Sequence, residues 1–237
     1  MKRIIVAGAG GGIGLALTAA LSDRPDVAQV YALHRLPVSG THPKVEWLQA
    51  DLSDAPEVEA AAAHIRASGG IDGLIIATGL LHEADLSPEK SLTDLDSTQL
   101  LKLYEINAVT PLMLLKACRD LFSDTPAPFA CLLSAQVGSI GDNRLGGWYG
   151  YRMAKAALNM GVKCAAIELA RLPTPPVIVA MHPGTTTTAL SYRFVKRRKQ
   201  PVSTPQHAAK RLLAVIDNLK PEDTGAFLNY DGAVLPW

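Results

Sequence analysis

A run of glycines near the N-terminus constrains the fold of this chain more than any other feature. Five of the seven residues from Gly8 to Gly14 are glycine, and Gly8, Gly12 and Gly14 follow a G-x-x-x-G-x-G spacing. They separate an apolar run at 3–7, typical of a buried strand, from an Ala/Leu-rich run at 13–21, typical of a helix. Missing side chains in such a turn let backbone amides and the helix N-terminus approach a pyrophosphate, and a tight turn with nothing bound is the alternative.

Strand and helix patterns alternate along the rest of the chain. We expect strands at 3–7, 27–33, 45–48, 72–78, 129–134, 177–181 and 226–230, and helices at 13–21, 55–67, 97–122, 150–172 and 204–219. Strands that are apolar on both faces belong to parallel sheets covered by helices. The pattern predicts an α/β fold: a single doubly wound Rossmann-type domain over 1–237, with a mostly parallel seven-stranded sheet and ligands at the carboxyl ends of the strands.

Charge and cysteine content limit the classes of function. The chain has 23 Lys and Arg against 22 Asp and Glu, which argues against a main role in binding nucleic acid or an anionic membrane. Cys118, Cys131 and Cys164 are far apart in apolar stretches, so we expect reduced thiols, a cytoplasmic location and no metal. The start after Lys2-Arg3 resembles a signal peptide, but the glycines favour a turn; elsewhere no apolar stretch is long enough to span a bilayer.

The end of the second predicted strand bears on the choice between NAD and NADP. An acidic residue there would hold the two ribose hydroxyls of NAD, but the strand ends Leu33-His34-Arg35. Arg35 is suited to pair with a 2′-phosphate, which favours NADP, and an ordinary solvated arginine is the alternative. Asp51 follows the third strand and is expected either to cap a loop or to accept a hydrogen bond from the adenine amine.

Tyr151 and Lys155 are four residues apart at the start of a predicted helix, so both side chains lie on one face. A neighbouring ammonium favours phenolate over phenol, which lowers the tyrosine pKa and suits the pair to acid–base chemistry near neutral pH. The same spacing recurs at Tyr192 and Lys196 in a basic loop. Position favours the first pair, because its helix follows the fifth strand and opens beside the expected ligand crevice.

With these motifs the whole chain resembles the short-chain dehydrogenase/reductase superfamily. The N-terminal glycine pattern, the Tyr-x-x-x-Lys spacing and His182-Pro183-Gly184 occur in the family's order. Residues 137–152 and the ending 225–237 are similar to one subgroup, the sniffer-type carbonyl reductases and C-factor proteins. The resemblance therefore implies a Rossmann-fold oxidoreductase.

The resemblance also implies roles for individual residues. Tyr151 matches the general acid that protonates the carbonyl oxygen, and Lys155 matches the residue that lowers the tyrosine pKa and binds the nicotinamide ribose. Asn107 matches the asparagine that interrupts a helix and holds a proton-relay water, although a helix-breaking polar residue is the alternative. The implied cofactor contacts are Gly8, Gly12, Ile13, Gly14, Arg35, Asp51, Leu52, Gly79, Tyr151, Lys155, Pro183, Gly184, Thr186 and Thr188.

The chain departs from the family pattern where the catalytic serine is expected. When Gly138 is matched to the family glycine, this serine aligns with Ala135, which has no hydroxyl to polarise a carbonyl. Ser139, 12 residues before Tyr151, is close to the family's interval and is favoured as the fourth catalytic residue. Ser134 is the immediate neighbour of Ala135 but is expected to point to the other face of its strand.

The sequence thus predicts NADP-dependent hydride transfer between nicotinamide and a small carbonyl or alcohol, without nucleic-acid or membrane partners. The alternative is a low-turnover NAD(P)-binding signalling or sensor protein of the C-factor type. The resemblance further implies a substrate lid at about 185–203 and a homodimer or homotetramer that pairs through helices containing 112–122 and 156–169. Five basic residues lie within 193–199, and we expect them to form a solvated loop more than a binding patch.

Overall fold

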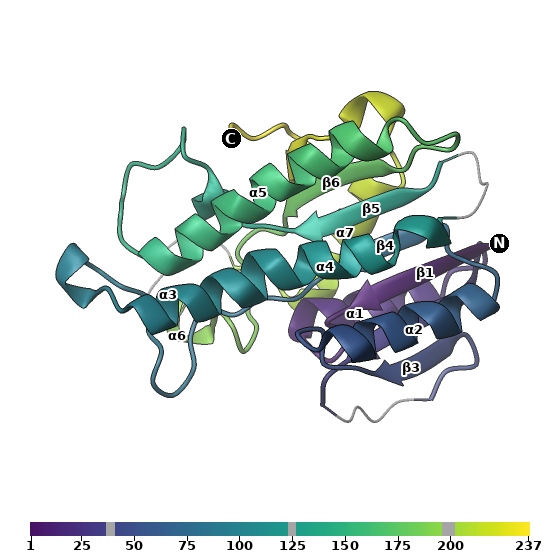
Figure 1. The fold of residues 1–237 in the computed structure, drawn as a ribbon, viewed down its shortest axis with the longest axis horizontal. Coiled ribbons are helices and arrows are strands. Elements are labelled where there is room, and N and C mark those ends of the chain that lie inside the picture. Colours follow the sequence, from purple (N-terminus) through teal and green to yellow (C-terminus); the bar gives the residue numbers. More distant parts are fainter. Residues whose placement is uncertain (37–40, 123–126, 196–201) are drawn as a thin grey trace.

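The central strand β1 (Lys2–Ala7) determines the layout of the sheet. It pairs in parallel with β2 on one side and with β4 on the other. The strand order is β3-β2-β1-β4-β5-β6-β7 and the named strands all pair in parallel, which confirms the predicted doubly wound fold (Figure 1). The remaining strands are β2 (Val27–His34), β3 (Val45–Gln49), β4 (Gly73–Ile76), β5 (Phe129–Leu133), β6 (Val177–His182) and β7 (Phe227–Asn229). Chain order reverses beside β1, and sheets of this kind bind ligands at such a switch point.

Helices cover both faces of this sheet, and Figure 1 shows α2, α4 and α5 on the near face with α1 and α7 behind. The computed structural model describes residues 1–36, 41–122, 127–195 and 202–237. The helices are α1 (Gly12–Ser22), α2 (Ala55–Ala67), α3 (Ser97–Tyr104), α4 (Thr110–Ala117), α5 (Tyr149–Leu169), α6 (Tyr192–Val195) and α7 (Pro205–Ile216). In β1, Ile5 packs into the core on one face and Ile4 and Val6 into the core on the other, and all three are buried.

Three helices begin at ordinary side-chain caps. Asp54, Asp96 and Thr204 accept hydrogen bonds from the first turns of α2, α3 and α7, as short polar residues at this position usually do. The two helices that start beside the switch point, α1 and α5, have no side-chain cap from the residue that precedes them. Their first N–H groups therefore have to find partners elsewhere.

The periodic pattern predicts one helix over 97–122, but the structure contains α3 and α4 separated by a π-helical turn at Glu105–Val109. Asn107 lies fully buried inside this turn. Its Nδ2 donates to Leu103 O at 2.9 Å and to Leu80 O at 2.8 Å. A side chain that bonds into the helix ladder and to a neighbouring loop explains the interruption, and π-turns of this kind are frequent at functional sites.

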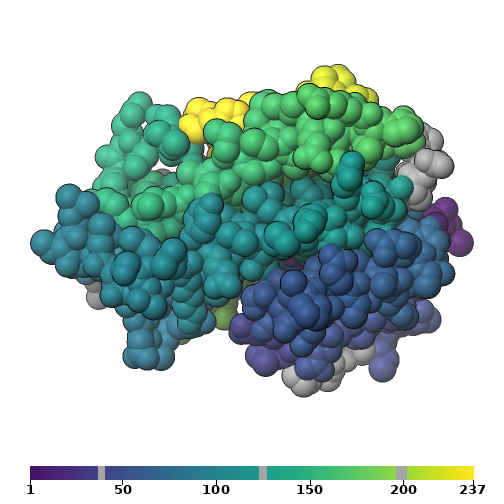
Figure 2. Space-filling model, in the orientation of Figure 1, coloured from purple at the N-terminus to yellow at the C-terminus, as the bar shows by residue number. Residues whose placement is uncertain are grey.

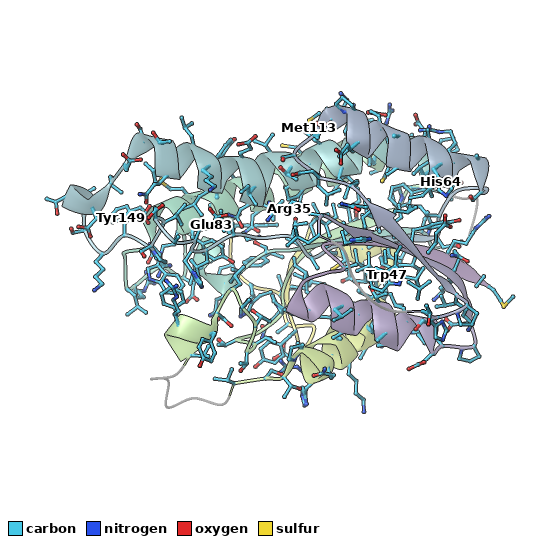
Figure 3. All side chains as sticks on the ribbon, turned by 90° about the horizontal axis from the view of Figure 1, so that it is seen from below. Arg35, Trp47, His64, Glu83, Met113 and Tyr149 are labelled. Carbon is cyan, nitrogen blue, oxygen red and sulfur yellow. The ribbon has the colours of Figure 1, made fainter. Side chains whose placement is uncertain are left out.

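Segments of α2 to α5 form a continuous near face in the space-filling view (Figure 2). Large apolar side chains are exposed along α3, α4 and α5: Leu101, Tyr104, Met113, Met153, Met160 and Ile167. Met113, labelled in Figure 3, points away from the sheet. Among the described helices, none combines the length and apolar character that a membrane span requires.

Candidate active site

The glycine turn lies at the carboxyl end of β1 and leads directly into α1. Gly8 has a φ of +78°, and a Cβ there would lie 3.0 Å from backbone atoms of Ala77, just beyond β4. A Cβ on Gly14 would lie 2.1 Å from Gly8 O. Gly11 precedes α1 and has no side chain to accept from the first N–H groups of the helix. The first turn of α1 also contains no acidic residue. The start of this helix can therefore meet an anion with its N–H groups.

Three cavities border the turn. The central cavity, about 390 Å³, is lined by Gly12, Tyr151 and Lys155 among others. The Arg35 cavity, about 500 Å³, extends from the glycine turn to Arg35 and Asp51. The apolar cavity, also about 500 Å³, shares Tyr151 with the central cavity and is walled mostly by aliphatic and aromatic residues. Tyr151 thus stands between a space beside the glycine turn and a space suited to an organic substrate.

The wall between the central cavity and the Arg35 cavity fits an extended polar ligand such as a dinucleotide. Thr78 lines both, and its buried Oγ1 has no hydrogen-bond partner among the described residues. A Cβ on Gly12 would lie 2.8 Å from Cγ2 of Thr188, so a side chain there would fill the gap between α1 and the segment after β6. A ligand that crosses both cavities can satisfy Thr78 and reach the start of α1.

Arg35 and Asp51 line the same cavity, together with Leu52, and Figure 3 labels Arg35 and Glu83 on its wall. Asp51 Oδ1 accepts hydrogen bonds from the backbone N–H of Ser53 at 2.9 Å and from its hydroxyl at 2.6 Å. These bonds hold the Asp51 pKa below its usual value, and the positive charge of Arg35 acts in the same direction. Of the two roles predicted for Asp51, the structure contains the loop cap.

The first turns of α5 bring Tyr151 and Lys155 to the central cavity. The side chains are 8% and 2% exposed, Lys155 Nζ lies 5.8 Å from the Tyr151 ring centroid, and Nζ donates to Leu133 O at 2.9 Å. Burial raises the Tyr151 pKa and lowers the Lys155 pKa to about 7. The direction expected from the Tyr–Lys spacing, a lowered tyrosine pKa, is therefore wrong for this geometry, because burial disfavours the phenolate.

The buried carboxylate of Glu89 supplies the cap that α5 lacks. Its two oxygens lie 3.3 and 3.2 Å from the N–H of Gly150, and its backbone carbonyl accepts from Trp148 N. Trp148 has a φ of +51° and is the one non-glycine residue of the described chain in the left-handed region. A carboxylate at a helix start is favourable, because it faces the positive end of the helix dipole. Glu89 thereby ties the loop after β4 to the helix that carries Tyr151.

Asn107 lies near Lys155 but is not among the described residues that line the three cavities. Its Oδ1 accepts from Leu80 N at 3.0 Å. A Cβ on Gly79, which lines the central and Arg35 cavities, would lie 3.3 Å from that oxygen and 3.9 Å from Lys155 Nζ. The Asn107 side chain thus holds the loop after β4 against the π-helical turn, and its role in a water relay stays a prediction.

Ala135 lies where the resemblance places the family serine. It lines the apolar cavity and packs against Tyr151. Ser139 is not among the described residues that line the three cavities: its Oγ donates to Trp237 O at 3.2 Å and accepts from Asp142 N at 3.0 Å. The catalytic role predicted for Ser139 therefore finds no support in this geometry, since the interval to Tyr151 does not place its hydroxyl in the site.

Ser134 takes an intermediate position. The residue lines both the central and the apolar cavity. Its hydroxyl, however, donates to Oδ1 of Asn159 on α5 at 2.6 Å. The hydroxyl proton of Ser134 is thus already used in a buried hydrogen bond, and this serine does not replace the hydroxyl missing at Ala135.

The segment after β6 forms the opposite wall. Pro183 and Thr188 line the central and apolar cavities, and Gly184 and Thr186 line the apolar cavity. Thr186 is buried, and its Oγ1 donates to Gly184 O at 3.2 Å. Ile13, at the start of α1, lines the same two cavities as Pro183. These residues surround the space between the glycine turn and Tyr151.

The second Tyr/Lys spacing has a different setting. Tyr192 is 51% exposed on α6. Lys196, most of the basic segment 193–199 and part of the predicted lid at 185–203 lie outside the described residues. The described part of this second pair is therefore a surface tyrosine, which agrees with the preference for Tyr151.

Pocket walls are expected at 80–92, at 140–148 and in the lid, and these segments contribute aromatic side chains to the lining of the central and apolar cavities. The Trp148 ring packs edge-on against Phe194 of α6, with centroids 5.0 Å apart, and His82 contacts Phe194 at 5.6 Å. Arg152 lines the apolar cavity. These side chains come from segments far apart in the sequence, and no spacing connects them. Arg152 lies outside the expected wall segments, and its sequence signal is that it directly follows Tyr151.

A parallel sheet with a glycine turn at its switch point, next to a cavity that holds a buried Tyr–Lys pair, defines a Rossmann-type oxidoreductase. Within that class the chain can be placed further. The model of the short chain dehydrogenase family matches residues 2–199, and the chain belongs to this family of NAD(P)-dependent enzymes.

Individual relatives agree with this assignment. The carbonyl reductase Sniffer of D. melanogaster is 26% identical with a TM-score of 0.85, and each chain is covered over 100%. The NADPH-bound carbonyl reductase from chicken fatty liver is also 26% identical with a TM-score of 0.85, over 100% of this chain and 99% of that one. C-signal of Myxococcus xanthus is 32% identical over 149 residues, 62% of this chain and 84% of C-signal. The predicted likeness to sniffer-type reductases and C-factor proteins is confirmed.

Proposed function

We propose that this chain is an NADP-dependent oxidoreductase that transfers hydride between nicotinamide and a small carbonyl or alcohol. The observation that carries the proposal is the position of Tyr151 on the wall shared by the central and apolar cavities, with Lys155 beside it. Likeness to an NADPH-bound carbonyl reductase supports it. The nicotinamide, when bound, supplies or accepts the hydride. The residues proposed to hold it are Gly8, Gly12, Ile13, Gly14, Arg35, Asp51, Leu52, Gly79, Lys155, Pro183, Gly184, Thr186 and Thr188, and the unpartnered hydroxyl adds Thr78.

Tyr151 acts as the general acid in the direction of reduction. Because burial raises its pKa, the phenol keeps its proton at neutral pH and can donate it to the carbonyl oxygen. Lys155, whose pKa burial lowers to about 7, can exchange a proton near neutral pH on the same cavity wall. Asn107 keeps Leu80 and Gly79 in place behind them. The apolar walls keep water from the reacting centre.

Arg35→Ala is expected to weaken binding of NADPH about 10- to 100-fold, because it removes charge-assisted hydrogen bonds to the 2′-phosphate, and to leave NADH binding nearly unchanged. Fluorescence titration of both cofactors measures the two dissociation constants. Arg66→Ala on α2 is the matched control, since Arg66 is exposed and outside the lining residues of the Arg35 cavity. Equal weakening of both cofactors in Arg35→Ala would remove the assignment of Arg35 to the 2′-phosphate.

The activity itself is tested by NADPH and NADH consumption with a panel of aldehydes, ketones and quinones. We expect turnover with NADPH, and slower turnover or none with NADH. Direct cofactor titration accompanies the assay, so that absence of turnover can be separated from absence of binding. A protein that binds neither cofactor would contradict the proposal at its first step.

A signalling or sensor role with little turnover is the second candidate. Two observations favour it: Ala135 leaves the expected polarising hydroxyl absent, and C-signal is among the relatives. Tight NADPH binding without turnover of any aldehyde, ketone or quinone tested would favour the sensor role. Biological activity that survives in a Tyr151→Phe protein with intact cofactor binding would do so more directly.

The proposal extends to the oligomeric state, the substrate lid and the domain organisation. We propose a homodimer or homotetramer in which copies pair through the exposed apolar side chains of α4 and α5 described above, such as Met113 and Met160. Apolar surface of this kind is costly to leave in water. Residues 185–203 are proposed as the substrate lid over a single domain of residues 1–237. A cytoplasmic location and the absence of nucleic-acid or membrane partners stay predictions from the sequence.

A further inference from the structure

Among the described residues that line the apolar cavity, Arg152 is the one Arg, Lys, Asp or Glu. The apolar residues that line the same cavity include Leu81, Ala135, Val137, Leu145, Trp148 and Leu190. Burial lowers the Arg152 pKa, but a guanidinium starts from a value above 12 and keeps its charge at neutral pH. A cation beside apolar walls attracts an opposite charge more strongly than one in open water.

Backbone carbonyls hold Arg152 in place. Its Nε donates to Gly147 O at 2.9 Å, and its Nη1 donates to Val137 O at 3.2 Å. A guanidinium has five N–H donors, so these two bonds leave most of its capacity unused. Within the described part of the chain, Nη2 makes no hydrogen bond. The side chain is thus oriented in advance, while part of its donor fork remains for a ligand.

No carboxylate of the described residues lies within 4 Å of the Arg152 guanidinium. Glu89 also reaches the start of α5, but its carboxylate is directed to Gly150 N. Gly147 and Val137 offer only neutral carbonyls. A partly buried cation without a counter-charge is unfavourable, and the neighbouring cavity can admit the anion that the protein does not supply.

We propose that Arg152 selects carbonyl substrates that carry a carboxylate group, an inference that rests on the proposed function. The cavity volume of about 500 Å³ is in the range of small-ligand sites. Tyr151 on its wall can meet the carbonyl, the apolar side chains can hold the carbon skeleton, and the planar guanidinium matches a carboxylate. Arg152 is then the residue that distinguishes a keto acid or aldehyde acid from its neutral analogue.

The test compares terephthalaldehydic acid with its methyl ester, which present the same aldehyde and differ in charge. With NADPH, the wild-type protein should prefer the acid, mainly through a lower KM. Arg152→Gln should reduce that preference about 10- to 100-fold, the size expected for loss of a charge-assisted hydrogen bond, with a much smaller change for the ester. Arg144→Gln, which removes an exposed charge from the loop before α5 but not from the cavity lining, should keep the preference.

Three results would overturn the inference: no preference for the acid in the wild-type protein, equal losses for acid and ester in Arg152→Gln, or an equal effect of Arg144→Gln. Equal losses would mean that Arg152 only supports the loop, and Arg152→Lys, which keeps the charge, provides the second comparison. NADPH affinity and unfolding midpoints verify that each variant is folded.

Binding of the acid to the NADP-loaded protein, followed by tryptophan fluorescence, separates this inference from the proposed function. Arg152-dependent binding without turnover would contradict the reductase activity and leave the anion site standing. Equal turnover of the acid and the ester would support the reductase activity and contradict the selective role of Arg152. Failure of the acid to bind would overturn the inference on its own.

Discussion

Tyr151→Phe is expected to lower kcat/KM for carbonyl reduction by about 10²- to 10⁴-fold, the range usually lost with a positioned general acid. The phenol lies on the wall between the two cavities and keeps its proton throughout the neutral range, because burial raises its pKa. Phenylalanine keeps the ring that packs against Trp148 at a centroid distance of 6.4 Å. Loss of activity should therefore come without loss of the cavity wall.

The measurement is NADPH consumption with the same carbonyl substrate, alongside NADPH affinity and the unfolding midpoint. Tyr149→Phe is the matched control: Tyr149 belongs to the same helix, is labelled in Figure 3, and is absent from the described lining of the three cavities. Turnover in Tyr151→Phe comparable to that of the control would show that the proton comes from another group.

Lys155→Met is expected to abolish most turnover and at the same time to stabilise the fold. Lys155 is 2% exposed, and burial lowers its pKa to about 7 from 10.5. That difference is a penalty on folding with the ammonium present, and methionine of similar length removes it. Leu133 O then loses its donor, which costs about 1–2 kcal/mol. The net gain in the free energy of unfolding is expected to be about 3 kcal/mol at pH 7.

The gain should depend on pH in a defined direction. Between pH 7 and about 10, the unfolded chain binds a proton at Lys155 that the folded chain has released, so wild-type stability rises with pH across this window. Below pH 7 both states hold the proton, and the full penalty is present. The advantage of Lys155→Met is therefore largest at pH 7 and below, and it shrinks towards pH 10.

Denaturant unfolding at pH 6.5 and pH 9.5, as roughly the two ends of that window, measures this difference. Lys163→Met on the same helix is the control, because Lys163 is exposed and its substitution should change stability little at either pH. A Lys155→Met protein that is less stable than wild type at both values would contradict the account of a desolvated ammonium.

The sheet could be predicted because its determinants are local. Strands buried on both faces read as continuous apolar runs, and the turn at Gly8 needs a residue that tolerates a positive φ. The break in the predicted helix at 97–122 has another origin, since it depends on hydrogen bonds from Asn107 to the distant Leu80. Periodicity alone does not reveal such a tertiary contact.

In the site, too, features set by local sequence can be predicted and features set by tertiary contacts cannot. Tyr151 and Lys155 could be found because one helix face carries both, but the direction of their pKa shifts depends on burial, which spacing does not report. The interval to Tyr151 favours Ser139, but the interval does not report the hydrogen bond from Ser139 to Trp237, 98 residues further along. The position of Arg152 in a cavity wall depends on segments that are distant in the sequence, so the sequence alone does not reveal it.

The loop after β4 is fastened at both ends, by Asn107 at Leu80 and by the bond between Glu89 and Gly150. The stretch between these anchors contributes Leu81 and His82 to cavity walls and supplies neither of the two anchoring contacts. Replacing this short stretch would therefore reshape the cavity walls while the glycine turn and the Tyr–Lys pair stay in place. For protein engineering it is a natural graft position, where segments from relatives can be transplanted between two fixed endpoints.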